Sequence, residues 1–219
     1  MTEFPQTPRN RVRRIPDRAR YEKNEIYAIL DEALVCHVGI VTEGRPLVLP
    51  MLPGRRGDTL YLHGALASRL LKHIGQGGEV CVSATLIDGL VLARSIFHHS
   101  VNYRSAVLFG KGRVVEEEDE KLRALEAISE HICPGRWDEA RRPSPRELAA
   151  TAVVGVEIES ASAKVRSGPV NDDPADADWP AWAGVLPLAW TAGEPIPAEG
   201  VNLPPPPTVT AYRRGKKAG

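Results

Sequence analysis

Apolar and polar positions alternate along this chain in a way that predicts a protein built mostly of strands. Residues 34–41 (LVCHVGIV) are apolar on both faces, which is typical of a strand inside a covered sheet. Residues 59–64 (TLYLHG) and 151–160 (TAVVGVEIES) alternate with a period of two, so each predicts a strand with one buried face. The same signals place further strands at 46–52, 79–87 and 106–116. The chain therefore has about six strands.

A smaller number of segments show the spacing of a helix. In 21–33, Ile26, Ile29 and Leu30 recur at helical spacing. Ser144, followed by Pro145 and then by a glutamate two residues later, is typical of a capping box. The helices predicted in this way lie at 21–33, 66–74, 117–132 and 144–151.

Turn residues between these segments decide how the strands are joined. Asp88-Gly89 separates two strand-like runs and predicts a hairpin. Pro50 lies inside a predicted strand, so its position is an edge, a bulge or a place where a ligand meets the backbone. GKG at 110–112 predicts a bend inside a strand or a point of close backbone approach. Because hairpins rather than helices join most strands, we expect an α+β fold, a small antiparallel barrel with helices at its ends.

Composition and charge narrow the functional class. The 219 residues hold 28 Lys and Arg against 28 Asp and Glu, and 42% are hydrophobic. A balanced charge does not predict a nucleic-acid partner. No apolar run is long enough to span a membrane, and the N-terminus lacks the apolar core of a signal peptide. We therefore expect a cytoplasmic protein that binds neither membrane nor nucleic acid.

Cysteines and histidines do not predict a metal site. Cys36, Cys81 and Cys133 are far apart and form no CxxC pair, which indicates free thiols. His98 and His99 are adjacent, so in an extended segment they face opposite sides and no carboxylate completes a ligand set.

Three regions differ in composition. Residues 1–20 form a basic arm with six arginines between Arg9 and Arg20, for which we expect dimer packing or a solvated position. Residues 21–190 carry the predicted barrel. Residues 191–219 are rich in proline, and we expect them to be extended and partly disordered.

Two polar stretches are the candidate functional sites. Residues 97–110 (FHHSVNYRSAVLFG) pack several different hydrogen-bonding side chains ahead of an apolar strand. In 63–70 (HGALASRL), a strand end and a glycine are followed by Ser68 and Arg69 at the start of a helix. This combination of hydroxyl, guanidinium and free backbone amides is suited to a phosphate, although such residues also serve as simple helix caps.

The order of these stretches, with WAGVLPL at 182–188, resembles the pyridoxamine 5′-phosphate oxidase-like family of flavin-binding split barrels. The branch with the 5-nitroimidazole reductases is the most similar. The resemblance covers roughly residues 11–190. It implies a six-stranded antiparallel split barrel, a homodimer, and FMN in a groove between the subunits.

The resemblance also assigns roles to residues. The second strand would lie against the flavin, and the segment after the third strand would bind its phosphate. Trp182 matches a family position near the flavin of the partner subunit. Leu70 stands where the vitamin oxidases have a second cation, so that charge would come from Lys72. The cofactor-binding residues implied in this way are Val48, Leu49, Pro50, Met51, His63, Gly64, Ser68, Arg69, Lys72, Arg104, Ser105 and Trp182.

The expected activity is that of an FMN-dependent oxidoreductase. It would pass electrons from NADH or NADPH to a small acceptor such as a nitroaromatic or a quinone, with FAD or the deazaflavin F420 as alternative cofactors. His98, His99 and Tyr103 are the candidates for substrate orientation or proton delivery. Two alternatives remain open: a non-catalytic flavin-storage protein and a haem-binding relative. The C-terminal region lacks the substrate-phosphate arginines of the vitamin oxidases, which argues against pyridoxamine phosphate as substrate.

Overall fold

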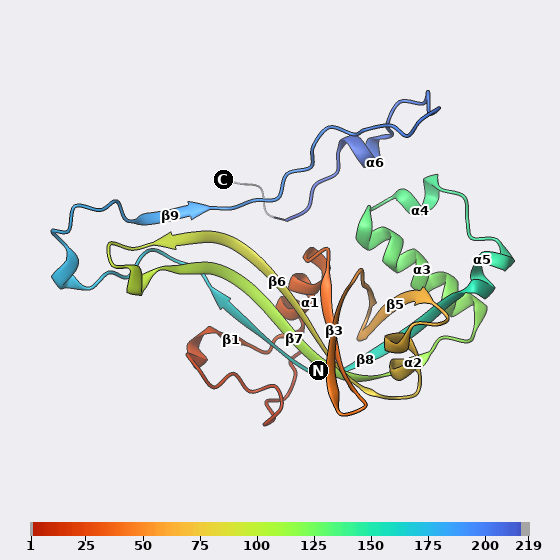
Figure 1. The fold of residues 1–219 in the computed structure, drawn as a ribbon, viewed down its shortest axis with the longest axis horizontal. Helices are drawn as coiled ribbons and strands as arrows, with labels where there is room; N and C mark the ends of the chain where they lie inside the picture. Colours follow the sequence, from red (N-terminus) through yellow and green to blue (C-terminus); the bar gives the residue numbers. More distant parts are fainter. Residues whose placement is uncertain (1, 216–219) are drawn as a thin grey trace.

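Nine strands form one antiparallel sheet in the computed structural model, which describes residues 2–215 (Figure 1). Seven of them lie in the order β3-β2-β6-β7-β8-β5-β4, while β1 pairs with β8 and β9 pairs with β6. The strands are β1 (Ala19–Arg20), β2 (Cys36–Thr42), β3 (Arg45–Met51), β4 (Gly54–Arg56), β5 (Thr59–Ala65), β6 (Glu79–Leu92), β7 (Ser100–Val114), β8 (Thr151–Arg166) and β9 (Gly184–Pro187). The antiparallel architecture is confirmed. The strand count exceeds six because β1, β4 and β9 are too short to produce a pattern in the sequence.

The helices follow the predicted ranges closely. They are α1 (Lys23–Glu32), α2 (Arg69–Gly75), α3 (Glu118–Ile132), α4 (Arg136–Glu139), α5 (Pro145–Ala150) and α6 (Pro207–Thr210), with 3₁₀ turns η1 (Pro16–Arg18), η2 (Ile96–His98) and η3 (Pro174–Asp176). The capping box at the start of α5 is present, since Ser144 and Glu147 each bind the backbone N–H of the other.

The main core lies where α1 and α2 pack against the curved sheet. Ile26 of α1 and Ile74 of α2 are fully buried among strand residues such as Leu62, Val82 and Leu108. These positions are the apolar stripes of the two helices and the inward face of the strands. The helices thereby fix the connection between β5 and α2.

The predicted hairpin at Asp88-Gly89 is wrong, because β6 continues through both residues as one strand. The register with β7 shifts between Ile87 and Gly89, so Asp88 is the extra residue of a β-bulge. Gly89 is paired on both sides, with Asn102 of β7 and with Pro187 of β9. Pairing on two sides keeps the strand extended where a free strand would turn.

The outer parts of β6, β7 and β9, with the connection between β6 and β7, form a projection that we call the arm, residues 87–104 and 182–187 (Figure 1). In Figure 1 the strands β6 and β7 curve together away from the barrel, and β9 runs beside β6. Residues 100–105 therefore belong to β7, which begins six residues before the start predicted at 106.

At GKG the structure confirms a point of close backbone approach. The register of β7 with β8 shifts between Phe109 and Gly110. A Cβ atom at Gly110 would lie 1.9 Å from the carbonyl oxygen of Glu157, and one at Gly112 would lie 2.1 Å from the side chain of Ile74. Only glycine fits at these two places.

The first and last described segments of the chain both contact the rest of the molecule. Phe4 is buried against the ring of Tyr27, and Asn10 is 3% exposed. At the other end, Thr208 Oγ1 donates to Glu139, and residues 191–215 contain α6 as their regular element. Residues 216–219 of the predicted tail lie outside the described part of the chain.

The three cysteines are free, and burial raises the pKa of the Cys36 thiol to about 12. Within residues 2–215, no group of three histidine, cysteine, aspartate or glutamate side chains is placed to hold a metal ion. No helix in the same range is long and apolar enough to cross a membrane.

Candidate functional site

The connection between β5 and α2 gathers polar groups at one end of the sheet. Ser68 is the N-cap of α2, and its Oγ accepts from the backbone N–H of Leu71 at 3.3 Å. The hydroxyl hydrogen of Ser68 therefore stays available as a donor. Arg69 and Lys72 follow on the helix, and neither side chain has a hydrogen bond or ion pair with the described residues. We call Ser68, Arg69, Lys72 and the preceding His63 the β5–α2 corner.

His63 is the residue of this corner whose environment is unusual. Its Nδ1 is buried without a hydrogen-bond partner in the described structure. Burial lowers the pKa of its imidazole, which favours the neutral ring at neutral pH. An unpaired buried nitrogen carries a cost unless something binds it. The corner therefore combines two free cations with a polar atom that lacks a partner, and it fits an anionic ligand.

The strand β3 is the second part of the candidate site. It is an edge strand that pairs with β2 alone, in a register that places Pro50 opposite His37. The prediction that Pro50 needs an edge is confirmed. Val48 and Leu49 are exposed although apolar. The helix α2 also packs against β2, which is the neighbour of β3.

Several predicted site residues lie on the arm, far from the β5–α2 corner of the same chain. His98 and His99 form the turn ahead of β7, while α2 contacts the opposite end of β7 near Gly112. Twelve residues of strand separate these places, which is a length of about 40 Å along the curved strand. His99 Nε2 lies 3.2 Å from the carbonyl oxygen of Ala93. Trp182 is 69% exposed, with its ring against Gly184 at the start of β9.

Tyr103, Arg104 and Ser105 lie on β7 at the base of the arm. Tyr103 is half-buried, and Ser105 Oγ donates to the carbonyl oxygen of Lys164 at 3.4 Å. One protomer therefore does not bring the β7 candidates and the β5–α2 corner together.

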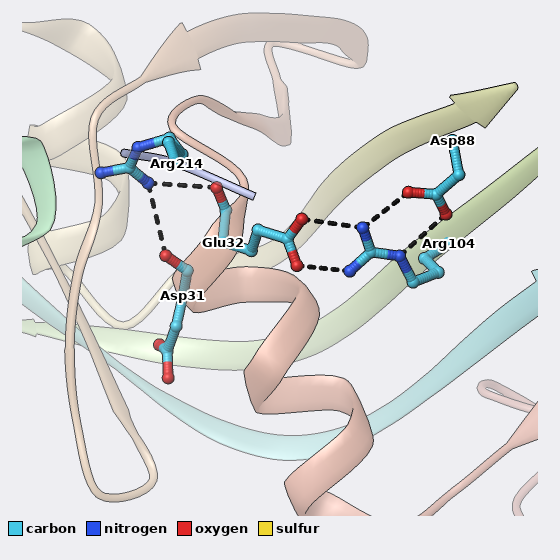
Figure 2. Close-up of polar contacts among 5 residues, drawn as sticks. All are labelled: Asp31, Glu32, Asp88, Arg104 and Arg214. Carbon is cyan, nitrogen blue, oxygen red and sulfur yellow. Dashed lines mark hydrogen bonds and ion pairs between the residues drawn. The ribbon is translucent and has the colours of Figure 1, made fainter. Parts of the chain in front are cut away.

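The side chain of Arg104 is bound by two carboxylates (Figure 2). Its Nε and Nη2 donate to Asp88 at 2.8 and 2.7 Å, and Nη1 and Nη2 donate to Glu32 at the end of α1. Asp88 and Glu32 raise the pKa of the guanidinium further. In this arrangement Arg104 joins α1 to the arm, so its donors face protein carboxylates and not the predicted flavin phosphate.

A contact from the C-terminal region completes this cluster. Arg214 donates to the backbone carbonyl oxygens of Asp31 and Glu32, at 3.4 and 3.1 Å (Figure 2). It also donates to the carbonyl oxygen of His131 near the end of α3. Two helix C-termini are thus capped by one side chain more than 80 positions away in the sequence. No local pattern indicates such a contact, so the roles of Glu32, Asp88 and Arg214 could not be predicted.

Comparison with known proteins adds independent findings. The family model described as pyridoxamine 5′-phosphate oxidase matches residues 22–165. No curated protein matches the chain.

Solved structures match it over nearly the whole length. The flavocytochrome Anf3 from Azotobacter vinelandii is 36% identical with a TM-score of 0.87, covering 95% of this chain and 98% of that chain. The FAD and haem binding protein from Mycobacterium smegmatis is 35% identical with a TM-score of 0.84, covering 90% and 98%.

A third structure shares the sheet over a shorter stretch. It is a putative 5-nitroimidazole antibiotic resistance protein from Bacteroides thetaiotaomicron, 29% identical with a TM-score of 0.56, covering 67% of this chain and 86% of that chain. The first two similarities, in contrast, each cover at least 90% of this chain.

Proposed function

The chain belongs to the pyridoxamine 5′-phosphate oxidase family, and from this premise we propose that it is a flavin-dependent redox protein. The observation that carries the proposal is the β5–α2 corner, with its two free cations and the unpaired Nδ1 of His63. When bound, the flavin would supply the chemistry of accepting hydride from NADH or NADPH and passing the electrons to an acceptor.

Within this proposal the corner holds the flavin phosphate. Arg69 offers a fork of donors to phosphate oxygens, and Lys72 adds a second positive charge. The hydroxyl of Ser68 donates a third hydrogen bond, and the neutral imidazole of His63 donates or accepts one through Nδ1. No acidic side chain lies between His63 and Gly78, so nothing local competes for these cations.

The edge strand β3 supplies a surface for the flat ring. The apolar side chains of Val48 and Leu49 are exposed there, and the backbone of residues 48–51 lies at a free edge. Pro50 lacks an N–H, so this position leaves no donor without a partner when the edge is covered.

The arm is the part of the molecule suited to a second copy of the chain. Ile96 and Phe97 at its tip are 84% and 88% exposed, and Trp182, just ahead of β9, is 69% exposed. Monomeric proteins rarely leave several large apolar side chains open together. In the homodimer that we propose, the arm of one protomer brings its histidines to the partner's β3 and corner. His98, His99 and Tyr103 would then orient the substrate or deliver a proton in trans.

The absorption spectrum and a nicotinamide titration test the function. The purified protein is expected to show the two flavin bands in the blue and near-ultraviolet, and NADH or NADPH is expected to bleach them without oxygen. A yellow protein that neither nucleotide bleaches would support flavin storage instead. A colourless protein that takes up neither FMN nor FAD would contradict the whole proposal.

Arg69→Ala is expected to weaken flavin binding about tenfold, because a charge-assisted contact to phosphate is lost. The measurement is the dissociation constant from quenching of flavin fluorescence. Arg146→Ala is the matched control, since Arg146 is also exposed, lies in the first turn of a short helix and has no partner in the described chain. Equal affinity in the two variants would refute the assignment of the phosphate to the corner.

A haem group is a second candidate cofactor, favoured by the two relatives that match at 36% and 35% identity and whose descriptions name a flavocytochrome and a haem-binding protein. The residue that could serve as a haem ligand is His37, which lines a mainly apolar hollow of about 200 Å³ with Leu86 and Trp190. This hollow is smaller than a typical ligand site, so most of the porphyrin would have to lie outside it. The side chain of His37 makes no hydrogen bond with the described residues. A Soret band in the same spectrum would establish haem binding, and its absence after reconstitution with haemin would exclude it.

A further inference from the structure

The N-terminal segment forms a fixed loop with a cleft in it. Asn10 Oδ1 accepts from the backbone N–H and the hydroxyl of Thr7 at 2.7 and 3.1 Å, and Nδ2 donates to the carbonyl oxygens of Pro5 and Ala161 at 3.0 Å. Because Ala161 belongs to β8, this buried side chain fastens the loop to the sheet. The hydroxyl of Tyr21 accepts from the N–H of Val12 at 3.0 Å and closes the loop from the other side.

The cleft has a volume of about 610 Å³, which is within the range of about 300–1,000 Å³ typical of ligand sites. Its walls include the rings of Pro8, Pro16 and Tyr21. Arg11 and Arg13 line it as well. No carboxylate is part of its lining, and the nearby Glu3 lines a separate hollow.

The arginines of this cleft differ from most others in the chain because they have no counter-charge. Neither the Arg11 nor the Arg13 side chain has a hydrogen bond or ion pair with any described residue. The side chains of Arg14 and Arg18, the next arginines along the loop, are equally without partners. By contrast, Arg9 and Arg20 of the same segment face Glu79 and Glu25. Four unpaired guanidinium groups within eight positions repel one another, and an anion would relieve that repulsion.

A backbone distortion accompanies the cleft. Ile15 has φ of 54°, in the left-handed region that a β-branched residue rarely adopts. Such a conformation costs on the order of 1 kcal/mol or more and persists where the surroundings impose it. Here it lies between the unpaired arginines and Pro16 on the cleft wall.

A second hollow, beside α1 and α3, does not compete as an anion site. It measures about 520 Å³, but Asp31, Glu32, Glu126 and Glu130 are part of its lining. Its arginine Arg55 is already paired with Asp31 at 2.5 Å. An anion entering there would meet carboxylates, whereas one entering the N-terminal cleft would not.

From these observations we propose that the N-terminal cleft binds a nucleoside diphosphate group. Its phosphates contact Arg11 and Arg13, which suit phosphate oxygens through their forked donors. Its flat base packs on the prolines and Tyr21. Such a group is present both in a nicotinamide dinucleotide and in the adenylate half of FAD. The site is separate from the β5–α2 corner and does not depend on the flavin proposal.

Calorimetric titration with ADP tests this inference on the full chain, both stripped of flavin and loaded with FAD. We expect ADP to bind the stripped protein, and Arg11→Gln with Arg13→Gln to weaken that binding at least about tenfold. The matched control is Arg123→Gln with Arg146→Gln, which removes the same charge from two exposed arginines on α3 and α5. This control is expected to bind ADP as the unchanged protein does.

The outcomes separate the possible sources of the nucleotide. Binding of ADP to the stripped protein alone would show that the adenylate half of FAD occupies the cleft, while binding to both forms would indicate the nicotinamide donor. The proposal is overturned if ADP fails to bind either form at millimolar concentration, or if the Arg11/Arg13 variant binds it normally. Pyrophosphate binding as tightly as ADP would refute the role of the apolar wall, and tighter binding of a short single-stranded RNA would assign the arginines to a polymer. A colourless protein that binds ADP would refute the flavin proposal and leave this one intact.

Discussion

Arg104→Ala is expected to lower the free energy of unfolding by about 3 kcal/mol, because it leaves two carboxylates without their shared cation. Arg104 is mostly buried, with its side chain 13% exposed, and Glu32 is 20% exposed. Breaking a buried pair from one side costs far more than losing a surface pair. Urea unfolding followed by far-ultraviolet circular dichroism measures the change.

Two further variants serve as controls for the effect of Arg104→Ala. Arg113→Ala removes another arginine that is bound by a carboxylate, since Arg113 donates two hydrogen bonds to Glu120. The side chain of Arg113 is 49% exposed, so we expect the free energy of unfolding to fall by less than about 1 kcal/mol. Adding Glu32→Gln to Arg104→Ala is expected to recover part of the stability, since one unpaired charge is removed. If Arg104→Ala instead unfolds at the same urea concentration as the unchanged protein and only loses flavin, then Arg104 serves the cofactor, as the family resemblance implied.

Gly110→Ala is expected to cost at least about 4 kcal/mol, because the added methyl would lie 1.9 Å from the carbonyl oxygen of Glu157. That oxygen belongs to the backbone of β8 and cannot rotate away. The strands β7 and β8 would have to separate at the bulge that joins them. Soluble yield and urea unfolding of the purified variant measure the effect.

The control for this variant is Gly193→Ala, where a Cβ atom would meet nothing within 4 Å. We expect it to change the free energy of unfolding by no more than about 0.5 kcal/mol. A Gly110→Ala protein as stable as Gly193→Ala would mean that β8 can shift its register at the bulge, and the close approach would then not constrain the fold.

The sequence predicts the elements whose signals are local. The helix α3 is an example, since its apolar spacing and its acidic first turn both lie within fifteen residues. The capping box of α5 is another, because Ser144 and Glu147 are three residues apart. Such patterns are complete in the sequence, so the antiparallel architecture and most helix ranges could be predicted.

Asp88-Gly89 shows why other features could not be predicted. An Asp-Gly pair suits both a tight turn and a bulge, and the choice here depends on β7 and β9 pairing with either side of β6. The strand β9 begins 95 positions after Gly89 in the chain. A hairpin signal read from neighbouring residues cannot include that partner.

The candidate site divides in the same way. Ser68 as the cap of α2 follows from its local sequence, and the structure confirms that geometry. The ion pairs of Arg104 with Glu32 and Asp88 do not follow from local sequence, because Glu32 is 72 positions away on another element. The separation of His98 from the β5–α2 corner likewise follows from the length of β7, which was predicted to begin six residues later.

The two prolines of β3 have a consequence for the protein before any ligand arrives. Pro46 and Pro50 lack the amide hydrogens through which an edge recruits another strand, and their rings obstruct its approach. We therefore expect the chain without ligand to resist forming fibrils, although the apolar side chains of its edge strand β3 are exposed. Such a chain can await its cofactor in the cell without aggregating with its neighbours.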